Sequence, residues 1–401
     1  MATPPPSPTT NVDLLLPFSM KHKGHLTLSC ESNGLRADFQ PLLGKPKGKF
    51  SIFFPIATYL DYSRNNFSSS IPNEIEDFLN KTLFFSLSSN NLHGPIPISI
   101  CNATVLRLLD LSNNSLSGMI PKCLIAGSLG ALNLRRNNFT GNLSNSIFTE
   151  DCLLESLDLS GNQIECQLPK SLIHCTGLQT LNLINNHITD SFPCFLKNLS
   201  TLRVLVLQSN KFYEHIGCSE ANETWPTLQI IEVAANNFNG EIPATYLTTW
   251  QTMMDRKDGV SVLGFTQVHG AYPSVSIQNA VTVTSKGLKI NLLKIISIFT
   301  LIDFSCNNFS GQVPKEIGDF ESLYVLNLFK NVFTGESSLS LGNIRNLEFL
   351  DLSHNKLSRK IPPQLANLSF LSFMNLSNNQ LVRRKTNWHS ILNIFKYLLY
   401  W

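Results

Sequence analysis

Charged residues are unusually few in this chain of 401 residues. Charged residues make up 15% of it, well below the roughly 25% of typical soluble domains. The formal net charge is only +3, which excludes the basic stripe expected of a nucleic-acid-binding protein. Because 43% of the residues are hydrophobic, the composition also excludes a chain that is disordered throughout.

Long apolar runs are missing as well. No stretch reaches the roughly 18 consecutive apolar residues that would span a bilayer. Near the start, the basic residues that begin at Lys21 follow the short apolar run Leu14–Leu16, which reverses the order of a secretory signal. Near the end, the apolar stretch 391–401 is interrupted by Asn393 and Lys396. We expect neither an export signal nor a membrane span in the chain as written.

Catalytic and metal-binding motifs are also absent. The sequence contains no glycine-rich phosphate loop, kinase signature or nucleophile elbow, and no cysteine–histidine spacing fits a zinc site. Several acidic residues share one position of a repeat, which explains them without a catalytic carboxylate pair. We expect no enzyme activity, no cofactor, no metal and no nucleic-acid partner. These acidic residues are Asp110, Asp158, Asp303 and Asp351.

What the sequence has instead is a repeat. The pattern leucine-x-leucine-x-x-asparagine, with apolar substitutions, occurs twelve times in two blocks, with steps of 23–26 residues inside each block. Chance does not give that spacing, and a fixed period of this length is typical of a solenoid. The repeated asparagines are Asn65, Asn90, Asn114, Asn137, Asn162, Asn186, Asn210, Asn236, Asn307, Asn331, Asn355 and Asn379.

Each part of the repeat has a physical reason, seen most clearly in the copy from Leu109 to Pro121. Alternating apolar residues point to one side of a short strand, because strand side chains alternate between faces. The asparagine lies where the chain turns and can bond to backbone groups of its own and the neighbouring coil, so stacked coils would form an asparagine ladder. One unit cannot bury its own apolar face, and the repeat therefore predicts an α/β solenoid with a concave parallel β-sheet.

The glycine-x-isoleucine-proline extension of the repeat resembles the plant-specific class of leucine-rich repeats, over roughly residues 55–383. The segments 86–104, 157–172 and 202–218 are similar to ectodomains of plant receptor-like proteins, particularly the Verticillium-wilt-resistance type. The resemblance implies a right-handed superhelix of horseshoe or spiral form. It also implies a location at the extracellular face of the plasma membrane. Family members carry an export signal, further repeats and a membrane helix, so the chain looks like part of a receptor-like ectodomain.

The repeat is interrupted between its two blocks. This insert is similar to the island of receptor-like ectodomains, which in that family folds against the solenoid and helps form the ligand-binding surface; a tolerated surface insertion is the alternative. We therefore expect a non-repeat segment at 1–54, repeats one to eight at 55–243, the insert at 244–297, repeats nine to twelve at 298–383 and a tail at 384–401.

Cysteines and glycosylation sequons indicate an extracellular design. Cys194 and Cys218 occupy equivalent places in adjacent coils, within reach of a disulfide. Two further candidate pairs, each about one coil apart, are Cys152–Cys175 and Cys101–Cys123. The odd count of nine cysteines leaves at least one unpaired within the chain. The glycosylation sites that we expect are Asn102, Asn198, Asn222, Asn308 and Asn367.

Binding residues are expected on the concave face, beside the core leucines. The candidate ligand-binding residues are Thr180, Asn182, Val206, Gln208, Glu232 and Asp303. In the last repeats, where the resemblance places a co-receptor, the candidate partner-binding residues are Asn327, Phe329, Asp351, Ser353 and Phe373. Phe329 and Phe373 are equally well explained as odd apolar residues in repeats that depart from the pattern.

Three functions are open at this point. The first is the recognition module of a kinase-less receptor-like protein, which binds an extracellular peptide or protein ligand and signals in defence through co-receptor or adaptor kinases. The second is a secreted inhibitor of a cell-wall-degrading enzyme; the insert counts against it, because such inhibitors have no island. The third is a truncated paralogue without a function of its own.

Overall fold

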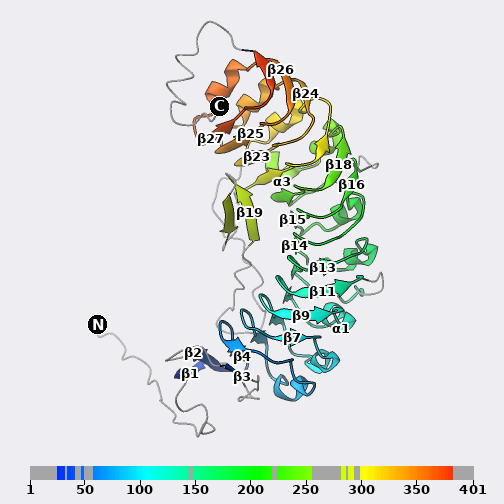
Figure 1. The fold of residues 1–401 in the computed structure, drawn as a ribbon, viewed down its shortest axis with the longest axis vertical. Coiled ribbons are helices and arrows are strands. Elements are labelled where there is room, and N and C mark those ends of the chain that lie inside the picture. The colour runs from blue at the N-terminus through cyan, green and yellow to red at the C-terminus, as the bar shows by residue number, and fades with distance from the viewer. Residues whose placement is uncertain are drawn as a thin grey trace, which may run out of the picture. The chain divides into compact units, whose positions relative to one another are not determined.

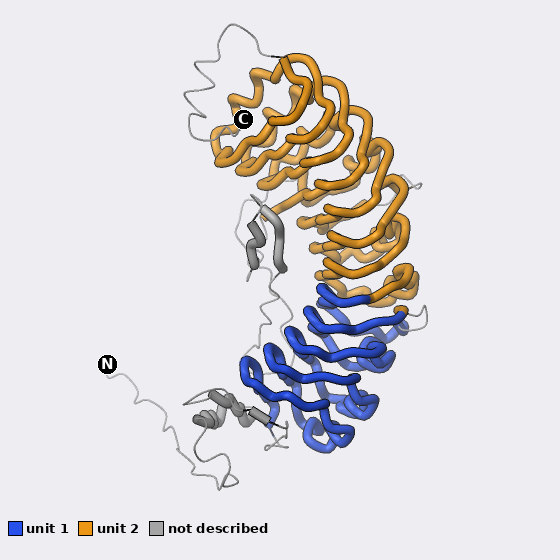
Figure 2. Tube along the Cα trace, in the orientation of Figure 1, with its two compact units in different colours: residues 1–141, 147–163, 266–277 blue, residues 142–146, 164–265, 278–401 orange. Residues whose placement is uncertain are grey.

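The computed structural model describes residues 25–31, 34–40, 47–48, 57–143, 148–218, 224–254, 281–285, 288–292 and 299–382. The chain divides into two compact units, shown in blue and orange in Figure 2. Unit 1 comprises residues 1–141, 147–163 and 266–277, and unit 2 comprises residues 142–146, 164–265 and 278–401. Both units are built from stacked coils, each of which contributes one short strand to a parallel sheet (Figure 1).

The main sheet of unit 1 pairs strands of successive coils in parallel and in direct register. At its first strand it continues into an antiparallel pair, β1 with β2, of which β2 runs parallel to β4. The strands are β1 (His25–Glu31), β2 (Gly34–Gln40), β4 (Tyr59–Asp61), β6 (Phe84–Ser86), β8 (Leu108–Asp110), β10 (Ala131–Asn133) and β12 (Ser156–Asp158).

The return half of each coil in unit 1 carries shorter strands and single helical turns. The extra strands pair in small parallel sheets separate from the main sheet. They are β3 (Lys47–Gly48), β5 (Asn66–Phe67), β7 (His93–Gly94), β9 (Ser115–Gly118) and β11 (Asn138–Gly141). The helical turns are η1 (Ile75–Phe78), η2 (Ile98–Asn102) and α1 (Lys122–Ala126), and the short strand β13 (Gln163–Ile164) follows β12 in the chain.

Unit 2 repeats this plan, with seven strands paired in parallel and in direct register. Their register continues from β17 straight to β21, although the insert separates the two strands in the sequence. The strands are β14 (Thr180–Asn182), β15 (Val204–Val206), β17 (Ile230–Glu232), β21 (Leu301–Asp303), β23 (Val325–Asn327), β25 (Phe349–Asp351) and β27 (Phe373–Asn375).

The return segments of unit 2 also carry short strands and helical turns. The strands are β16 (Tyr213–Glu214), β18 (Asn237–Gly240), β22 (Asn308–Phe309), β24 (Thr334–Glu336), β26 (Lys356–Lys360) and β28 (Gln380–Val382). The helical turns are η3 (Lys170–His174), η4 (Cys194–Asn198), η5 (Lys315–Asp319), η6 (Leu339–Asn343) and η7 (Pro363–Asn367). Within the expected insert lie α2 (Ala244–Leu247), α3 (Gln251–Met254) and an antiparallel hairpin of β19 (Val281–Ser285) and β20 (Leu288–Leu292).

The core of each coil is built from the alternating apolar residues of the repeat. In unit 2, phenylalanines of successive coils stack on one another behind the asparagine turn. Phe238 lies between Phe212 and Phe309, with ring centroids 5.9 Å and 6.1 Å apart, and Phe309 continues to Phe333 at 6.2 Å. All four rings are fully buried. These stacked aromatics join neighbouring coils by direct packing, since offset rings at such separations attract one another.

The repeated asparagines form a hydrogen-bonded ladder within each unit. The Asn331 Nδ2 donates to the carbonyl of Phe304 in the preceding coil at 3.0 Å and to that of Leu328 in its own coil at 3.2 Å. Its Oδ1 accepts the N–H of Phe309, again in the preceding coil, at 3.0 Å. The same three kinds of bond recur at Asn90, Asn114, Asn137, Asn162, Asn210, Asn236, Asn307, Asn355 and Asn379.

The residue before each of these asparagines has a left-handed backbone, a feature that the repeat pattern did not predict. Gly161 adopts it at little cost, with φ of 66°, whereas Ala235 has φ of 52° and pays the penalty of a side chain in that region. The turn is tight enough that the ladder amide fits under it. Further residues with this backbone are Arg64, Ser89, Asn113, Arg136, Asn185, Ser209, Cys306, Lys330, His354 and Asn378.

Candidate functional site

The main sheet of unit 2 has an inner face toward the core and an outer face, and the candidate binding residues belong to the outer face. In β15, for example, the middle residue Leu205 lies in the core, so Val204 and Val206 take the opposite side. Direct register then aligns equivalent residues of neighbouring strands into two rows. The first-position row is Thr180, Val204, Ile230, Leu301, Val325, Phe349 and Phe373; the third-position row is Asn182, Val206, Glu232, Asp303, Asn327, Asp351 and Asn375.

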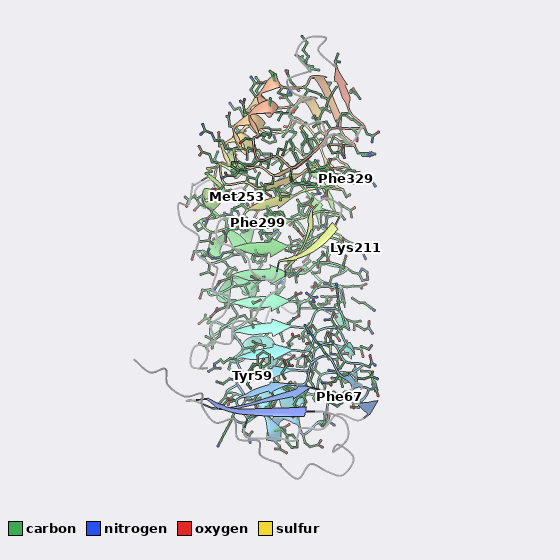
Figure 3. The ribbon with its side chains drawn as sticks, turned by 90° about the vertical axis from the view of Figure 1, so that its left-hand side faces the viewer. Tyr59, Phe67, Lys211, Met253, Phe299 and Phe329 are labelled. Atoms are coloured by element: carbon green, nitrogen blue, oxygen red, sulfur yellow. A yellow bond between two sulfur atoms is a disulfide. The ribbon has the colours of Figure 1, made fainter. Side chains whose placement is uncertain are left out.

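From Val204 to Phe349 the first-position row is apolar and buried. Its members from Val204 to Phe349 form one hydrophobic cluster together with Ile184 and Val206, and Phe299, Tyr324 and Phe373 pack against that cluster. Phe373 stacks on Phe349 with ring centroids 4.6 Å apart. Figure 3 labels Phe299, which lies toward the start of the strands, and Phe329, which lies toward their end. The outer face of this sheet therefore carries a second apolar layer in addition to the core.

The third-position row is polar from Glu232 onward, and its side chains cap the turns that follow the strands. The Asp303 Oδ1 accepts the N–H of Ser305 at 2.9 Å, and the Asp351 Oδ1 accepts that of Ser353 at 2.9 Å. Asn327 caps Phe329 in the same way at 3.1 Å. These short-range bonds are Asx turns, so this position of the repeat has a structural role at Asp303, Asn327 and Asp351.

Neighbouring side chains of the row also bond to one another. The Asn327 Nδ2 donates to the Asp303 Oδ2 at 3.1 Å, and the Asn375 Nδ2 donates to the Asp351 Oδ2 at 3.4 Å. Burial nevertheless raises the pKa of Asp303 from 3.8 to about 6, and Asp351 adds to the rise by charge repulsion. Burial likewise raises the pKa of Asp351. Removal from water disfavours the charged form more than these bonds favour it.

The six candidate ligand-binding residues all lie on or beside this outer face, but five of them are buried from solvent. Thr180, Asn182, Val206, Glu232 and Asp303 are at most 2% exposed, and Gln208 alone is half-buried. Sequence reasoning placed them on the right face and expected an open surface there. Their role in binding stays a prediction, and direct contact with a ligand would require five of these side chains to be uncovered.

The candidate partner-binding residues in the last coils differ among themselves. Asn327, Asp351 and Ser353 are buried, and the first two serve as turn caps. Phe329 and Phe373 are half-buried. Phe329 packs edge-on against the His354 ring, with centroids 5.2 Å apart. The two phenylalanines are therefore the members of this set that a partner could reach without rearrangement.

The disulfides and sequons have definite places in the fold. Cys194 is disulfide-bonded to Cys218 and Cys101 to Cys123, with Cα atoms 5.5 Å and 5.6 Å apart. Cys152 and Cys175 are also disulfide-bonded, whereas Cys166 and Cys306 are free. Asn102, Asn198 and Asn367 are exposed and each is the last residue of a helical turn, in η2, η4 and η7. Asn308 is exposed in β22, and Asn222 lies outside the described residues.

Two further kinds of feature, a metal site and a membrane-spanning helix, are absent from the described residues. Among them, no three histidine, cysteine or acidic side chains come together in a way that could hold a metal ion. In the same part of the chain, none of the helices has the length and apolar character needed to cross a membrane.

Known proteins share both the repeat and the fold. The Leucine Rich Repeat family model matches residues 105–125, 153–175, 177–199 and 346–368. Receptor-like protein 35 of Arabidopsis thaliana is 41% identical over 282 residues, which are 68% of this chain and 28% of that protein. Receptor-like protein 54 of the same plant is 40% identical over 302 residues, or 73% of this chain and 36% of that protein. Over two thirds or more of its length, the chain is thus similar to plant leucine-rich repeat receptor-like proteins.

Solved structures agree with this receptor-like fold. The crystal structure of a TDR receptor superposes with a TM-score of 0.65 at 22% identity, covering 81% of this chain and 48% of that one. The Arabidopsis HAESA ectodomain, solved in complex with an IDA peptide hormone, gives a TM-score of 0.52 at 23% identity and covers 79% of this chain and 53% of that one. The α/β solenoid of leucine-rich repeats is thereby confirmed. The chain spans about a third of the length of the two receptor-like proteins.

Proposed function

We propose that this receptor-like chain is an extracellular recognition module that binds a peptide or protein ligand and signals in defence through partner kinases. The observation that carries the proposal is the 41% identity to a receptor-like protein over 68% of the chain. A rigid array of stacked coils suits an extended ligand, because its surface is ordered before binding and little entropy is lost. Binding rather than catalysis is the activity that such a surface supports.

The ligand surface that we propose is the outer sheet face of unit 2 together with the insert. In the hairpin of the insert, the register pairs Val281 with Leu292 and Val283 with Ile290, so alternate rows are apolar. Eight residues separate Leu292 from Leu301 of the first-position row, a span of at most about 30 Å. The hairpin can thus reach the apolar row, and a ligand would then meet the insert as well as Gln208.

Partner kinases are proposed to dock on the last coils, at Phe329 and Phe373. A related fold supports the kind of assembly: the HAESA receptor kinase was solved with the peptide hormone IDA and the co-receptor SERK1, at a TM-score of 0.50. Half-buried aromatic side chains are frequent anchors of protein interfaces. The defence role and the identity of the kinases rest on the resemblance to receptor-like proteins.

An extracellular location is proposed on the cysteines and sequons. Two disulfides that join adjacent coils fit an oxidising compartment, and three exposed sequon asparagines recur at the ends of helical turns. The test is mass spectrometry of the full chain expressed in leaves behind a secretion signal. We expect glycans on Asn102, Asn198 and Asn367 and a Cys194–Cys218 bond; unmodified asparagines with free thiols would contradict the location.

The binding proposal is tested by immobilising the secreted full chain and measuring saturable capture of peptides from fractionated microbial and plant extracts. Gln208→Ala is expected to weaken capture of a bound peptide by tenfold or more, a typical effect at an interface hot spot. A matched change on the return side of unit 2, Lys315→Ala, should leave capture unchanged. Equal losses in both variants, or capture that does not saturate, would count against the outer sheet face.

A further inference from the structure

One short strand on the return side of the coils differs from the others in its charge. From β5 to β24, none of these described strands contains a lysine or an arginine, whereas β26 contains three such residues, Lys356, Arg359 and Lys360. All three are exposed, and we call them the basic patch. In Figure 1, β24 and β26 lie on the opposite side of the coils from β23, β25 and β27. The basic patch is therefore separate from the outer sheet face of unit 2.

The charge of the basic patch is not balanced by its neighbours. Among the described residues, no acidic side chain forms an ion pair with Lys356, Arg359 or Lys360. The neighbouring strand β24 carries one acid, the exposed Glu336, which is paired in register with Ser358. One acid beside three cations leaves this side of the last coils positive.

One member of the basic patch has a strained backbone. Arg359 occupies the glycine position of the repeat, four residues after the ladder asparagine, and has φ of 69°. The equivalent Gly311 and Gly335 have φ of 74° and 78°, a region that glycine enters freely and other residues enter only with strain. Glu214 has the same conformation in an earlier coil, so strain by itself identifies no site. At Arg359 it coincides with unbalanced charge, and strained residues gather at functional sites.

Protection of a sheet edge does not explain the basic patch. Natural sheets place lysines on edge strands, where they prevent pairing with another chain. In the sheet of β24, β26 and β28, however, β26 is the central strand. The described edge strands β24 and β28 contain no lysine or arginine. The cations therefore stand on the strand that needs this protection least.

The surroundings of the basic patch do not suit a protein partner. In register, Lys356 is paired with Thr334 and Lys360 with Val382, and the described strands of this sheet contain no aromatic residue. Protein interfaces are anchored by aromatic or large side chains in desolvated pockets. An anionic membrane is also disfavoured on the extracellular side, because anionic lipids are concentrated in the cytoplasmic leaflet.

The arrangement of the cations suits an extended chain of carboxylates. Lys356 and Lys360 are four residues apart on one strand, which is roughly 13 Å and too far for one small anion to bridge. Arg359 lies between them and can hold a carboxylate by two parallel hydrogen bonds, whereas each lysine offers a point charge. Several carboxylates repeated along one polymer would meet all three side chains.

We propose that the basic patch of β26 binds a linear polyuronate, the anionic class of polysaccharide in plant cell walls. Lys356 and Lys360 pair with carboxylates of separate sugar residues, and Arg359 holds a carboxylate between them. The contact anchors the return side of the last coils and leaves the outer sheet face to its ligand. The inference goes beyond the proposed ligand binding, because it concerns another surface, and it rests on the proposed extracellular location.

The experiment measures binding of the full secreted chain, with disulfides intact, to immobilised polygalacturonate in calcium-free buffer. The matched control is fully methyl-esterified polygalacturonate, which keeps the sugar chain and loses the charge. We expect saturable binding to the acid that weakens as sodium chloride rises from about 50 mM to about 300 mM, because salt screens exposed charges. Binding to the ester should be at least about tenfold weaker, since ion pairs are lost. Equal binding to the two polymers would overturn the proposal.

The first variant combines Lys356→Gln with Lys360→Gln. We expect about tenfold weaker binding to polygalacturonate, because two exposed ion pairs of small individual strength are lost. The control variant combines Lys211→Gln with Lys122→Gln and removes the same charge from two other exposed lysines. Lys211, labelled in Figure 3, holds the repeat position of Lys356 in an earlier coil. Equal losses in the two variants would assign the binding to net charge and overturn the patch.

The second variant, Arg359→Gly, restores the glycine of the repeat. It should weaken binding about threefold through the lost ion pair and raise the melting temperature, because the strain is relieved. A merely structural role would change the melting temperature alone. Unchanged binding in a folded Arg359→Gly variant would overturn the part assigned to Arg359.

Two further outcomes would contradict the polyuronate. The first is stronger binding of the wild type to phosphatidylserine vesicles than to polygalacturonate, which would assign the patch to a membrane. The second is self-association of the double lysine variant with unchanged polygalacturonate binding, which would assign the lysines to protection of the sheet. None of these measurements uses a peptide ligand, so failure of the basic patch and failure of the proposed binding function are distinguishable.

Discussion

The outer sheet faces of the two units are built on the same repeat and yet treat their acids differently. From β4 to β12 in unit 1, the third strand position alternates acids with uncharged residues, and Asp61, Asp110 and Asp158 are half-buried. In unit 2 the corresponding residues Glu232 and Asp303 stand side by side and are sealed. The repeat thus fixes where a carboxylate sits, while its neighbours decide how much of it reaches the surface; burial raises the pKa of Asp110 in unit 1 as it does that of Asp303 in unit 2.

The units also differ in how they join one coil to the next behind the asparagine turn. Unit 2 stacks four buried phenylalanines there in succession, whereas in unit 1 Leu92 and Leu116 separate Phe67 from Phe139. Aromatic rings bury more surface and attract their neighbours directly. Truncating a side chain should therefore lower stability more in the aromatic join than in the aliphatic one, since more contact is lost with each ring.

The largest effect is expected from truncating one core side chain in each of these two joins. Phe238→Ala should lower the free energy of unfolding by about 4 kcal/mol and Leu116→Ala by about 3 kcal/mol, because the ring leaves the larger cavity. Equilibrium unfolding in guanidinium measures both. A larger loss for Leu116→Ala would contradict the stronger join that we ascribe to the phenylalanine stack.

A smaller effect is expected from the ladder, which both units share. Asn331→Ala removes a bond to its own coil and two bonds to the preceding coil. It should cost about 3 kcal/mol, since the buried backbone groups of Phe304 and Phe309 lose their partners. Asn114→Ala, at a half-buried rung of unit 1, should cost less because water can replace the amide. Equal losses at the two rungs would show that burial of a rung does not set its contribution.

The smallest effect is expected at the left-handed turn positions. There unit 2 offers an alanine that can be changed to glycine, and unit 1 offers a glycine that can be changed to alanine. Ala235→Gly should stabilise the protein by about 0.5 kcal/mol, because relief of the left-handed strain slightly exceeds the entropy lost with glycine. Gly161→Ala should destabilise it by about 1 kcal/mol, and the new Cβ would also lie 3.4 Å from the Arg136 side chain. Thermal melting of the two variants in parallel is the measurement, and shifts of the same sign would refute the account.

Much of this fold could be predicted from the sequence, because the repeat is local and regular. Alternation of Leu109 and Leu111 is enough to orient a strand, and the fixed period places Asn114 at a turn. The left-handed residue before each asparagine could not be predicted, since Arg, Ser, Ala, Cys, Lys and His all occupy that position. Asparagine or glycine, which tolerate this backbone, occupies only four of the twelve positions, namely Asn113, Gly161, Asn185 and Asn378.

The candidate site was less predictable for a different reason. Period-two reasoning correctly assigns Val206, Glu232 and Asp303 to the outer face, but exposure depends on what packs over that face. An apolar first-position row, visible in the sequence as Val204, Ile230, Leu301, Val325 and Phe349, was the available signal that this face is not open to water. Burial of the acids follows from that row and from register across the insert, neither of which is a property of a single repeat.

The asparagine ladder gives the solenoid a direction. In every rung described above, the side-chain amide serves backbone groups of the coil that precedes it, so the ladder bonds of each coil are supplied by its successor. Within unit 2, loss of the coil that contains Asn331 would leave the β21 coil with unsatisfied groups, whereas loss of the β21 coil would leave the turn around Asn331 bonded to its own carbonyls and to Asn355. Because the ladder bonds run in one direction, unravelling of such a stack is easier from one end than from the other.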